Sequence, residues 1–334
     1  MSHKHDRALR VLASSQQLGL EAFRAFNREI AAALAALDRS RASTFDVHAA
    51  RKQIKRARAI LRLLRGAIGD VSYSREDAAL RAAARQLNEY RDAEVLLRTC
   101  DRISRKIEGS SRKAGVASLR AILLRARKSA QRTLQSKALP QAQSVLAEAH
   151  SRTRHWHAED ARNALADGLA STYRKGRAAF HKVQCSSTDR RLHGWRRQAK
   201  YTWHQLEILQ VLAPASIERI ARRFGRLSDY IGDDHDLAML SARAHECATV
   251  LDRFSLRTLS RLIKRRRKKL QAKAIELGER LYRRPPGKFL AWLAEAATNR
   301  PVRIHPDARA RRRSSAAPTR SDGEARRQPQ VRRE

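Results

Sequence analysis

The 334-residue sequence is poor in the residues that build turns and strands. It holds only 13 Gly and 8 Pro, four of those prolines lie beyond Arg300, and no long stretch alternates between apolar and polar residues. The helix formers Ala, Leu, Arg and Lys are abundant instead. This composition argues against a β-rich fold and predicts an all-α protein.

Long apolar runs and paired cysteines are missing as well. No stretch approaches the roughly 20 apolar residues of a membrane span, and the N-terminal MSHKHDRALR has no apolar signal region. The three cysteines (Cys100, Cys185 and Cys247) are far apart and form no CxxC pattern. We therefore expect a cytoplasmic protein that keeps its cysteines reduced and has no membrane span.

Acidic residues are too few to balance the basic ones. Seventy-two Lys and Arg stand against 33 Asp and Glu, a net charge of +39 at pH 7. Residues 300–334 hold 11 Arg and 4 acids, so the rest of the chain carries +32. Such self-repulsion indicates a polyanionic partner: nucleic acid, an anionic membrane surface or an inorganic polyanion. Because residues 300–334 have few large apolar side chains, we expect them to form a disordered Arg-rich tail.

A strongly basic helix is predicted over Val47–Arg65. Apolar residues recur there every three or four positions and suit a core. A second stripe beside them recurs at the same steps and carries the charge. It comprises His48, Arg51, Lys52, Lys55, Arg58 and Arg62. Since like charges at this spacing repel one another, we expect the stripe to bind an anion.

The same pattern returns 145 residues later, over Leu192–Leu209. A second similarity follows each copy at an offset of 144, where Tyr90–Leu97 resembles Asp234–Ser241. Two long helical halves with the same marked helix predict an internal duplication, at a period far too long for a solenoid. The equivalent basic residues of the second copy are His193, Arg196, Arg197 and Lys200.

Breaks rich in Gly and Ser divide the chain into about four expected helices per half. Short loops between long amphipathic helices favour antiparallel bundles. In the first half the expected helices are 7–38, 46–66, 75–109 and 115–137, and a short helix at 141–150 joins the halves. In the second half they are 158–182, 189–212, 215–247 and 254–283, with a last piece reaching about 297.

The pattern H-x-x-R-[KR]-x-x-K, found twice and followed each time by D-x-x-[VM]-L, resembles the CHAD family, the conserved histidine α-helical domain. The resemblance covers residues 8–297, with halves of about 8–150 and 155–297. It implies two four-helix bundles related by pseudo-twofold symmetry around a basic central groove. It also implies non-catalytic binding of inorganic polyphosphate and association with polyphosphate granules.

Two further helices add basic residues to the predicted polyphosphate site. In TYRKGRAAF, Arg174 and Arg177 lie three residues apart. Arg266 interrupts the apolar line of another helix, where burying a charge without an anion is costly. It either pairs with an acid such as Asp233 or Asp236, or faces the ligand channel.

The remaining His and acidic residues indicate structural roles rather than a metal site or a catalytic site. His150, His155 and His157 are weak evidence for a metal, because no Cys or carboxylate pattern lies nearby. The sequence has no Gly-rich phosphate loop, G-x-S-x-G, H-E-x-x-H or E-x-E-x-K of a CYTH triphosphatase, so we expect neither enzyme nor cofactor. The acids expected to pair with and orient the basic stripe are Asp92, Glu94, Asp233, Asp234 and Asp236.

Nucleic acid is the alternative partner, and we expect it to bind more weakly than polyphosphate. It would use the same charge together with aromatic stacking or base-edge contacts. The chain has only 4 Trp, 6 Tyr and 7 Phe, and the basic helix offers Gln53 as its single amide. A phosphatase or polyphosphate kinase is disfavoured, because neither a metal site nor a phosphate-carrying His motif is evident.

Overall fold

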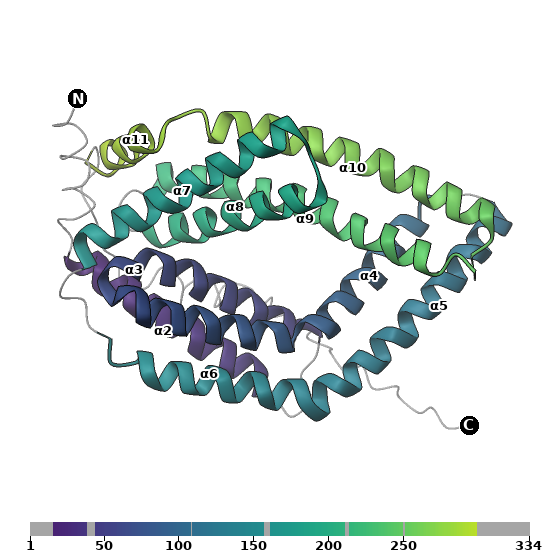
Figure 1. Ribbon diagram of the computed structural model, residues 1–334, viewed down its shortest axis with the longest axis horizontal. Coiled ribbons are helices and arrows are strands. Elements are labelled where there is room, and N and C mark those ends of the chain that lie inside the picture. Colours follow the sequence, from purple (N-terminus) through teal and green to yellow (C-terminus); the bar gives the residue numbers. More distant parts are fainter. Residues whose placement is uncertain are drawn as a thin grey trace, which may run out of the picture. The chain divides into compact units, whose positions relative to one another are not determined.

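A computed structural model describes residues 16–38, 44–107, 109–156, 161–210, 214–249 and 251–298. All regular structure in these ranges is helical (Figure 1), so the all-α prediction is confirmed for them. The expected start at residues 7–15 and the 300–334 tail lie outside the described residues. The helices are α2 (Gln16–Leu37), α3 (Thr44–Gln86), α4 (Asn88–Ser104), α5 (Ser110–Thr133), the π-helical η1 (Leu134–Ala138), α6 (Leu139–Thr153), α7 (Ala161–Cys185), α8 (Asp189–Leu209), α9 (Pro214–Glu246), α10 (Arg253–Leu281) and α11 (Pro286–Thr298).

The basic helix predicted over Val47–Arg65 forms the first part of α3. The expected break falls at Gly69, where the backbone leaves helical geometry and α3 bends; its φ of 77° lies in the left-handed region that glycine enters without steric penalty. The chain also breaks at Leu87, so the expected single helix 75–109 is wrong and is divided between α3 and α4. A single glycine is therefore enough for the turn that we assigned to a longer loop.

The predicted separation between helices 115–137 and 141–150 is also wrong. α5, η1 and α6 follow one another without interruption from Ser110 to Thr153. The wider π turn of η1 directly precedes Pro140, and this local widening accommodates a residue that has no N–H to donate within a continuous helix. The gap that we expected between residues 137 and 141 is thus part of one helical run.

The buried apolar side chains form two clusters, and neither belongs to one half of the chain. The larger cluster combines α2, α3 and α6 with α7, α8, the first part of α9 and the end of α10. The smaller cluster joins Leu97, Cys100 and Leu119 of α4 and α5 to Leu240 and Ile263 of α9 and α10. The two halves are therefore packed into each other; their pseudo-twofold relation stays a prediction.

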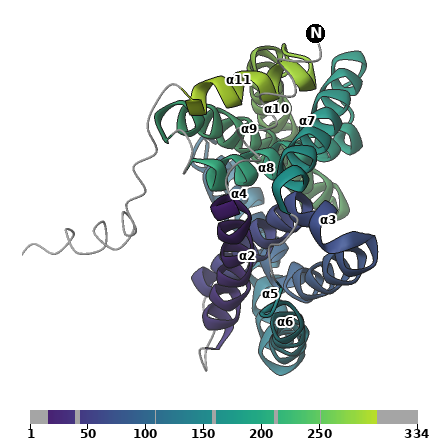
Figure 2. The same cartoon turned by 90° about the vertical axis from the view of Figure 1, so that its left-hand side faces the viewer.

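The two marked helices lie against each other at the centre of the larger cluster. Both views place α3 beside α8 (Figures 1 and 2), and the two helices are in contact. Gln205 of α8 donates a hydrogen bond to the Ala59 carbonyl of α3 at 3.0 Å and another to Thr172 of α7 at 3.1 Å. Because α4 also packs on α9, side chains from four helices meet at this crossing.

Candidate functional site

A basic groove of about 380 Å³ lies where α3, α4, α8 and α9 meet. Six of the predicted residues line it, four from the first copy of the repeated pattern (His48, Arg51, Lys52 and Lys55) and two from the second (Arg196 and Lys200). The sequence thus brings together two stripes that are 145 residues apart. The groove is lined by His48, Arg51, Lys52, Lys55, Arg91, Val95, Arg98, Arg196, Lys200, Trp203, His204, Ser228, Asp229, Gly232, Asp233 and Asp236.

The guanidinium groups of Arg51 and Arg196 are only partly satisfied. Arg51 donates to the carbonyl of Ala84 at 2.8 Å and to the side chain of Asn88. The Nε atoms of Arg51 and Arg196 are both buried and have no hydrogen-bond partner among the described residues. Since a buried donor without an acceptor costs about 1–3 kcal/mol, these atoms favour an incoming anion.

The lysines of the groove are held in an environment that opposes their charge. Burial first, and then the neighbouring Lys200 and Arg51, lower the pKa of Lys55 to about 6. Burial also lowers the pKa of Lys200 to about 8, with Arg196 as the next cause. The pKa of Arg51 falls to about 10 for the same reasons, burial first and Arg91 second. An anion in the groove would relieve both causes at once.

A model of the CHAD domain family matches residues 21–245. The chain belongs to the CHAD domain family. Among solved structures, the chain is similar to the crystal structure of the CHAD domain from the plant Ricinus communis, at 14% identity and a TM-score of 0.45, covering 87% of this chain and 91% of that one. No curated protein matches.

The two marked histidines of this CHAD domain lie at different places. His48 lines the groove, whereas His193 faces His235, with ring centroids 5.3 Å apart. Burial lowers the pKa of His48, and Lys55 and the arginines around it add to the effect. The pKa of His193 is lowered by burial and then by His235. Without an anion, both rings therefore favour the neutral form at neutral pH; the charged form beside phosphate stays a prediction.

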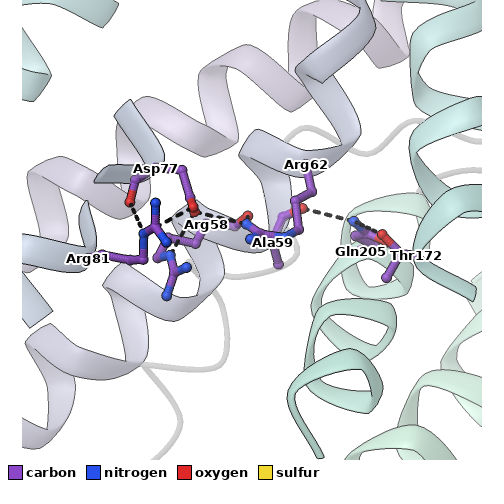
Figure 3. A network of polar contacts seen from close by, with 7 residues as sticks. All are labelled: Arg58, Ala59, Arg62, Asp77, Arg81, Thr172 and Gln205. Atoms are coloured by element: carbon purple, nitrogen blue, oxygen red, sulfur yellow. Dashed lines mark hydrogen bonds and ion pairs between the residues drawn. The ribbon is translucent and has the colours of Figure 1, made fainter. Parts of the chain in front are cut away.

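The far end of the α3 stripe serves an ion-pair network instead of the groove. Arg58 and Arg62 both donate to the buried carboxylate of Asp77, at 2.9 and 3.0 Å, and Arg81 reaches its other oxygen at 3.3 Å (Figure 3). The Arg62 guanidinium also lies over the ring of Tyr201, 4.2 Å from its centroid. The structure thus does not place Arg58 or Arg62 with the groove residues.

The other predicted residues are dispersed. Arg197 lines a separate cavity between α3, α7 and α8 together with Arg62. Arg174 is exposed on α7, and the Arg177 Nε donates to the carbonyl of Tyr282 at 3.1 Å. Arg266 is exposed and lines a cavity between α4 and α10, so it is not a buried charge.

Sequence reasoning missed the contribution of α4. Arg91 and Arg98 line the groove, and their spacing of seven residues on one helix was a usable signal.

The five acids form ion pairs with arginines, but not with those of the predicted basic stripe. Their ion pairs are Arg91 with Asp92 (2.8 Å) and Asp236 (3.5 Å), Arg102 with Asp233 (3.1 Å), Arg127 with Glu94 (3.2 Å) and Arg267 with Asp234 (2.9 Å).

The described residues contain neither a cluster of metal ligands nor a helix suited to span a membrane. Within the described ranges, no group of three or more His, Cys, Asp or Glu side chains could hold a metal ion. His150 and His155 lie at the end of α6 and just after it, and His157 lies outside those ranges. Among the helices that the structure describes, none combines the length and apolar character of a membrane span.

Proposed function

We propose that the groove binds inorganic polyphosphate without catalysing a reaction on it. The observation that carries this proposal is the cluster of Arg51, Lys55, Arg196 and Lys200, which are buried or half-buried, repel one another and form no ion pair with a described carboxylate, although Asp229, Asp233 and Asp236 line the same groove. Burying cations that nearby carboxylates offset only in part is unfavourable, and a polyanionic ligand would supply the missing negative charge. The association of the CHAD family with polyphosphate in general supports the same ligand.

Polyphosphate suits the groove better than nucleic acid does. A phosphate chain offers only charge and oxygen acceptors, which Arg and Lys side chains bind as forked donors and point charges. Nucleic acid would add base stacking, but Trp203 is already stacked on His204, with ring centroids 4.6 Å apart. The groove therefore offers charge in abundance and little free aromatic surface.

A competition titration tests the ligand. Labelled long-chain polyphosphate is displaced by unlabelled polyphosphate, single-stranded DNA or double-stranded DNA at equal phosphate concentration and several salt concentrations. We expect polyphosphate to compete best, and its affinity to fall steeply with salt, because binding releases condensed counterions. Stronger competition by either DNA, or a flat salt response, would reject polyphosphate as the preferred ligand.

A separate assay tests the absence of catalysis. The protein is incubated with polyphosphate and Mg²⁺ or Mn²⁺, and orthophosphate is measured against a heat-denatured control. We expect equal release in both samples. Sustained release by the native protein that is lost with the groove variant Arg51→Ala/Lys55→Ala would contradict a binding role. Granule association is tested by whether a fluorescent fusion follows polyphosphate granules in cells and whether the same variant disperses it.

A further inference from the structure

A second basic cavity lies between α4 and α10. It has a volume of about 290 Å³, and five basic side chains and one carboxylate line it over an apolar floor that belongs to the smaller core cluster. The lining residues are Arg102, Ile103, Lys106, Asp233, Leu237, Leu262, Arg265, Arg266, Lys269 and Leu270. We call this the α10 cavity.

Four of its five cations have no acidic partner among the residues that the structure describes. Arg102 pairs with Asp233 at 3.1 Å. Lys106, Arg265, Arg266 and Lys269 are all exposed, and none of them forms an ion pair with another described residue. In an ordinary solvated helix face, basic side chains at steps of three and four are usually interleaved with acids. Here they converge on one hollow, which gives it a local excess of positive charge.

Helix α4 connects this cavity to the basic groove. Arg91, Arg98 and Arg102 recur at steps of seven and four, so they lie on one face of α4 over about 16 Å of its length. The first two line the groove and the third lines the α10 cavity, with Lys106 just past the helix end. A row of cations therefore leads from one cavity to the other.

Asp233 marks the border between them. It is the one carboxylate that lines both cavities, and its partner Arg102 belongs to the connecting row. The ion pair spans the border at the surface, where both side chains are partly exposed, at 38% and 45%. Exposed pairs of this kind contribute at most about 1 kcal/mol to stability. A phosphate of the polyanion can therefore replace the Asp233 carboxylate as the partner of Arg102.

We infer that the α10 cavity is a distal subsite for the same polyanion, reached only by chains long enough to leave the groove along α4. This inference rests on the proposed function and adds a length requirement to it. Short chains fill the groove alone, whereas long chains also contact Arg265, Arg266 and Lys269. Affinity per chain should then rise in a step once the chain spans both cavities.

The test compares two charge-matched variants of α10 on a ladder of chain lengths. Arg265→Ala/Arg266→Ala/Lys269→Ala empties the subsite. The control Arg261→Ala/Lys264→Ala/Lys268→Ala removes the same charge from exposed residues of the same helix that line none of the described cavities. Dissociation constants are measured from tripolyphosphate up to long chains, and circular dichroism melting checks that both variants fold.

We expect the subsite variant to weaken long-chain binding by at least about tenfold, because three charge-assisted contacts are lost, and to leave tripolyphosphate binding within about twofold. The control should show only a small loss that is equal at all lengths. Equal weakening of short and long chains by the subsite variant, or an equal loss in the control, would overturn the distal subsite and leave the groove intact. Failure of the wild-type protein to bind at any length would instead overturn the proposed function.

Discussion

At the scale of single residues, Lys55 lowers the stability of the fold while it supplies a cation for anion binding. Burial beside Lys200 and Arg51 lowers its pKa from 10.5 to about 6. Because the folded pKa lies below the unfolded one, the unfolded chain binds more protons between these values. The lysine therefore destabilises the fold increasingly as the pH falls from about 10 to about 6. The side chain is retained at a cost that an anion would offset.

This cost predicts that Lys55→Met stabilises the protein while weakening polyphosphate binding. Met keeps the length of the side chain and removes an amine that must lose its proton to fit the free groove at neutral pH, which should raise the free energy of unfolding by about 1–4 kcal/mol. Thermal melting without ligand and titration with polyphosphate measure the two effects. Lys52→Met is the matched control, because Lys52 is exposed at the groove edge and should leave the melting temperature unchanged. A lower melting temperature for Lys55→Met would contradict the account.

The same pKa predicts that polyphosphate binding takes up protons. Near pH 7 the free groove holds Lys55 mostly neutral, and the bound polyanion raises its pKa, so each binding event should draw up to about one proton from the buffer. Affinity should fall as the pH rises from about 6 to about 8, by at most about tenfold per pH unit for each proton taken up. Calorimetry in two phosphate-free buffers of different ionisation enthalpy counts the protons. The absence of net proton uptake would show that the groove is already fully charged.

At the scale of helices, periodicity predicted which face of α3 is basic but not what that face meets. His48, Arg51, Lys52 and Lys55 enter the groove as expected. Arg58 and Arg62 continue the same stripe, yet Asp77 lies beside them because α3 bends at Gly69 and brings its second part back onto the first. Helical spacing predicts which side chains share a face of one helix. Which residues that face contacts depends here on the bend at Gly69, and the local sequence does not predict the geometry of that bend.

This division of the stripe predicts different outcomes for two equal charge removals on α3. Arg51→Ala/Lys55→Ala should weaken polyphosphate binding by about 3–6 kcal/mol, because two charge-assisted contacts are lost, with helix content preserved. Arg58→Ala/Arg62→Ala should lower stability by about 3–5 kcal/mol, because it leaves the buried Asp77 with Arg81 alone, and should spare most of the affinity of the folded fraction. Both pairs are titrated with polyphosphate and melted side by side.

Arg196→Ala/Lys200→Ala extends this comparison to α8. We expect a loss similar to that of the α3 groove pair, since all four side chains line one groove. If the α8 pair binds like the wild type, the groove is one-sided. If Arg58→Ala/Arg62→Ala reduces affinity as strongly as the groove pair at equal folded fraction, net charge rather than geometry governs binding.

At the scale of the whole molecule, the sequence repeat predicted two halves but not how their cores are shared. A hydrophobic stripe specifies that a face is buried, and the same stripe can pack within a half or across halves. In the smaller cluster, Leu97 and Leu119 of the first half pack with Leu240 and Ile263 of the second. The groove has the same origin, since it takes Lys55 from one half and Lys200 from the other.

Shared cores predict that neither half folds alone. A fragment of residues 1–156 would expose the apolar faces of α3, α4 and α5 that the second half covers, and a fragment of residues 157–300 would expose those of α7, α9 and α10. Exposing that much apolar surface removes the main driving force for folding, so each fragment should show reduced helicity and no cooperative melting. Mixing the two should restore both, together with polyphosphate binding, because the groove needs α3 and α8 side by side. A cooperative transition in either isolated fragment would mean that this half carries a sufficient core of its own, and the packing across the halves would then account for the groove but not for the fold.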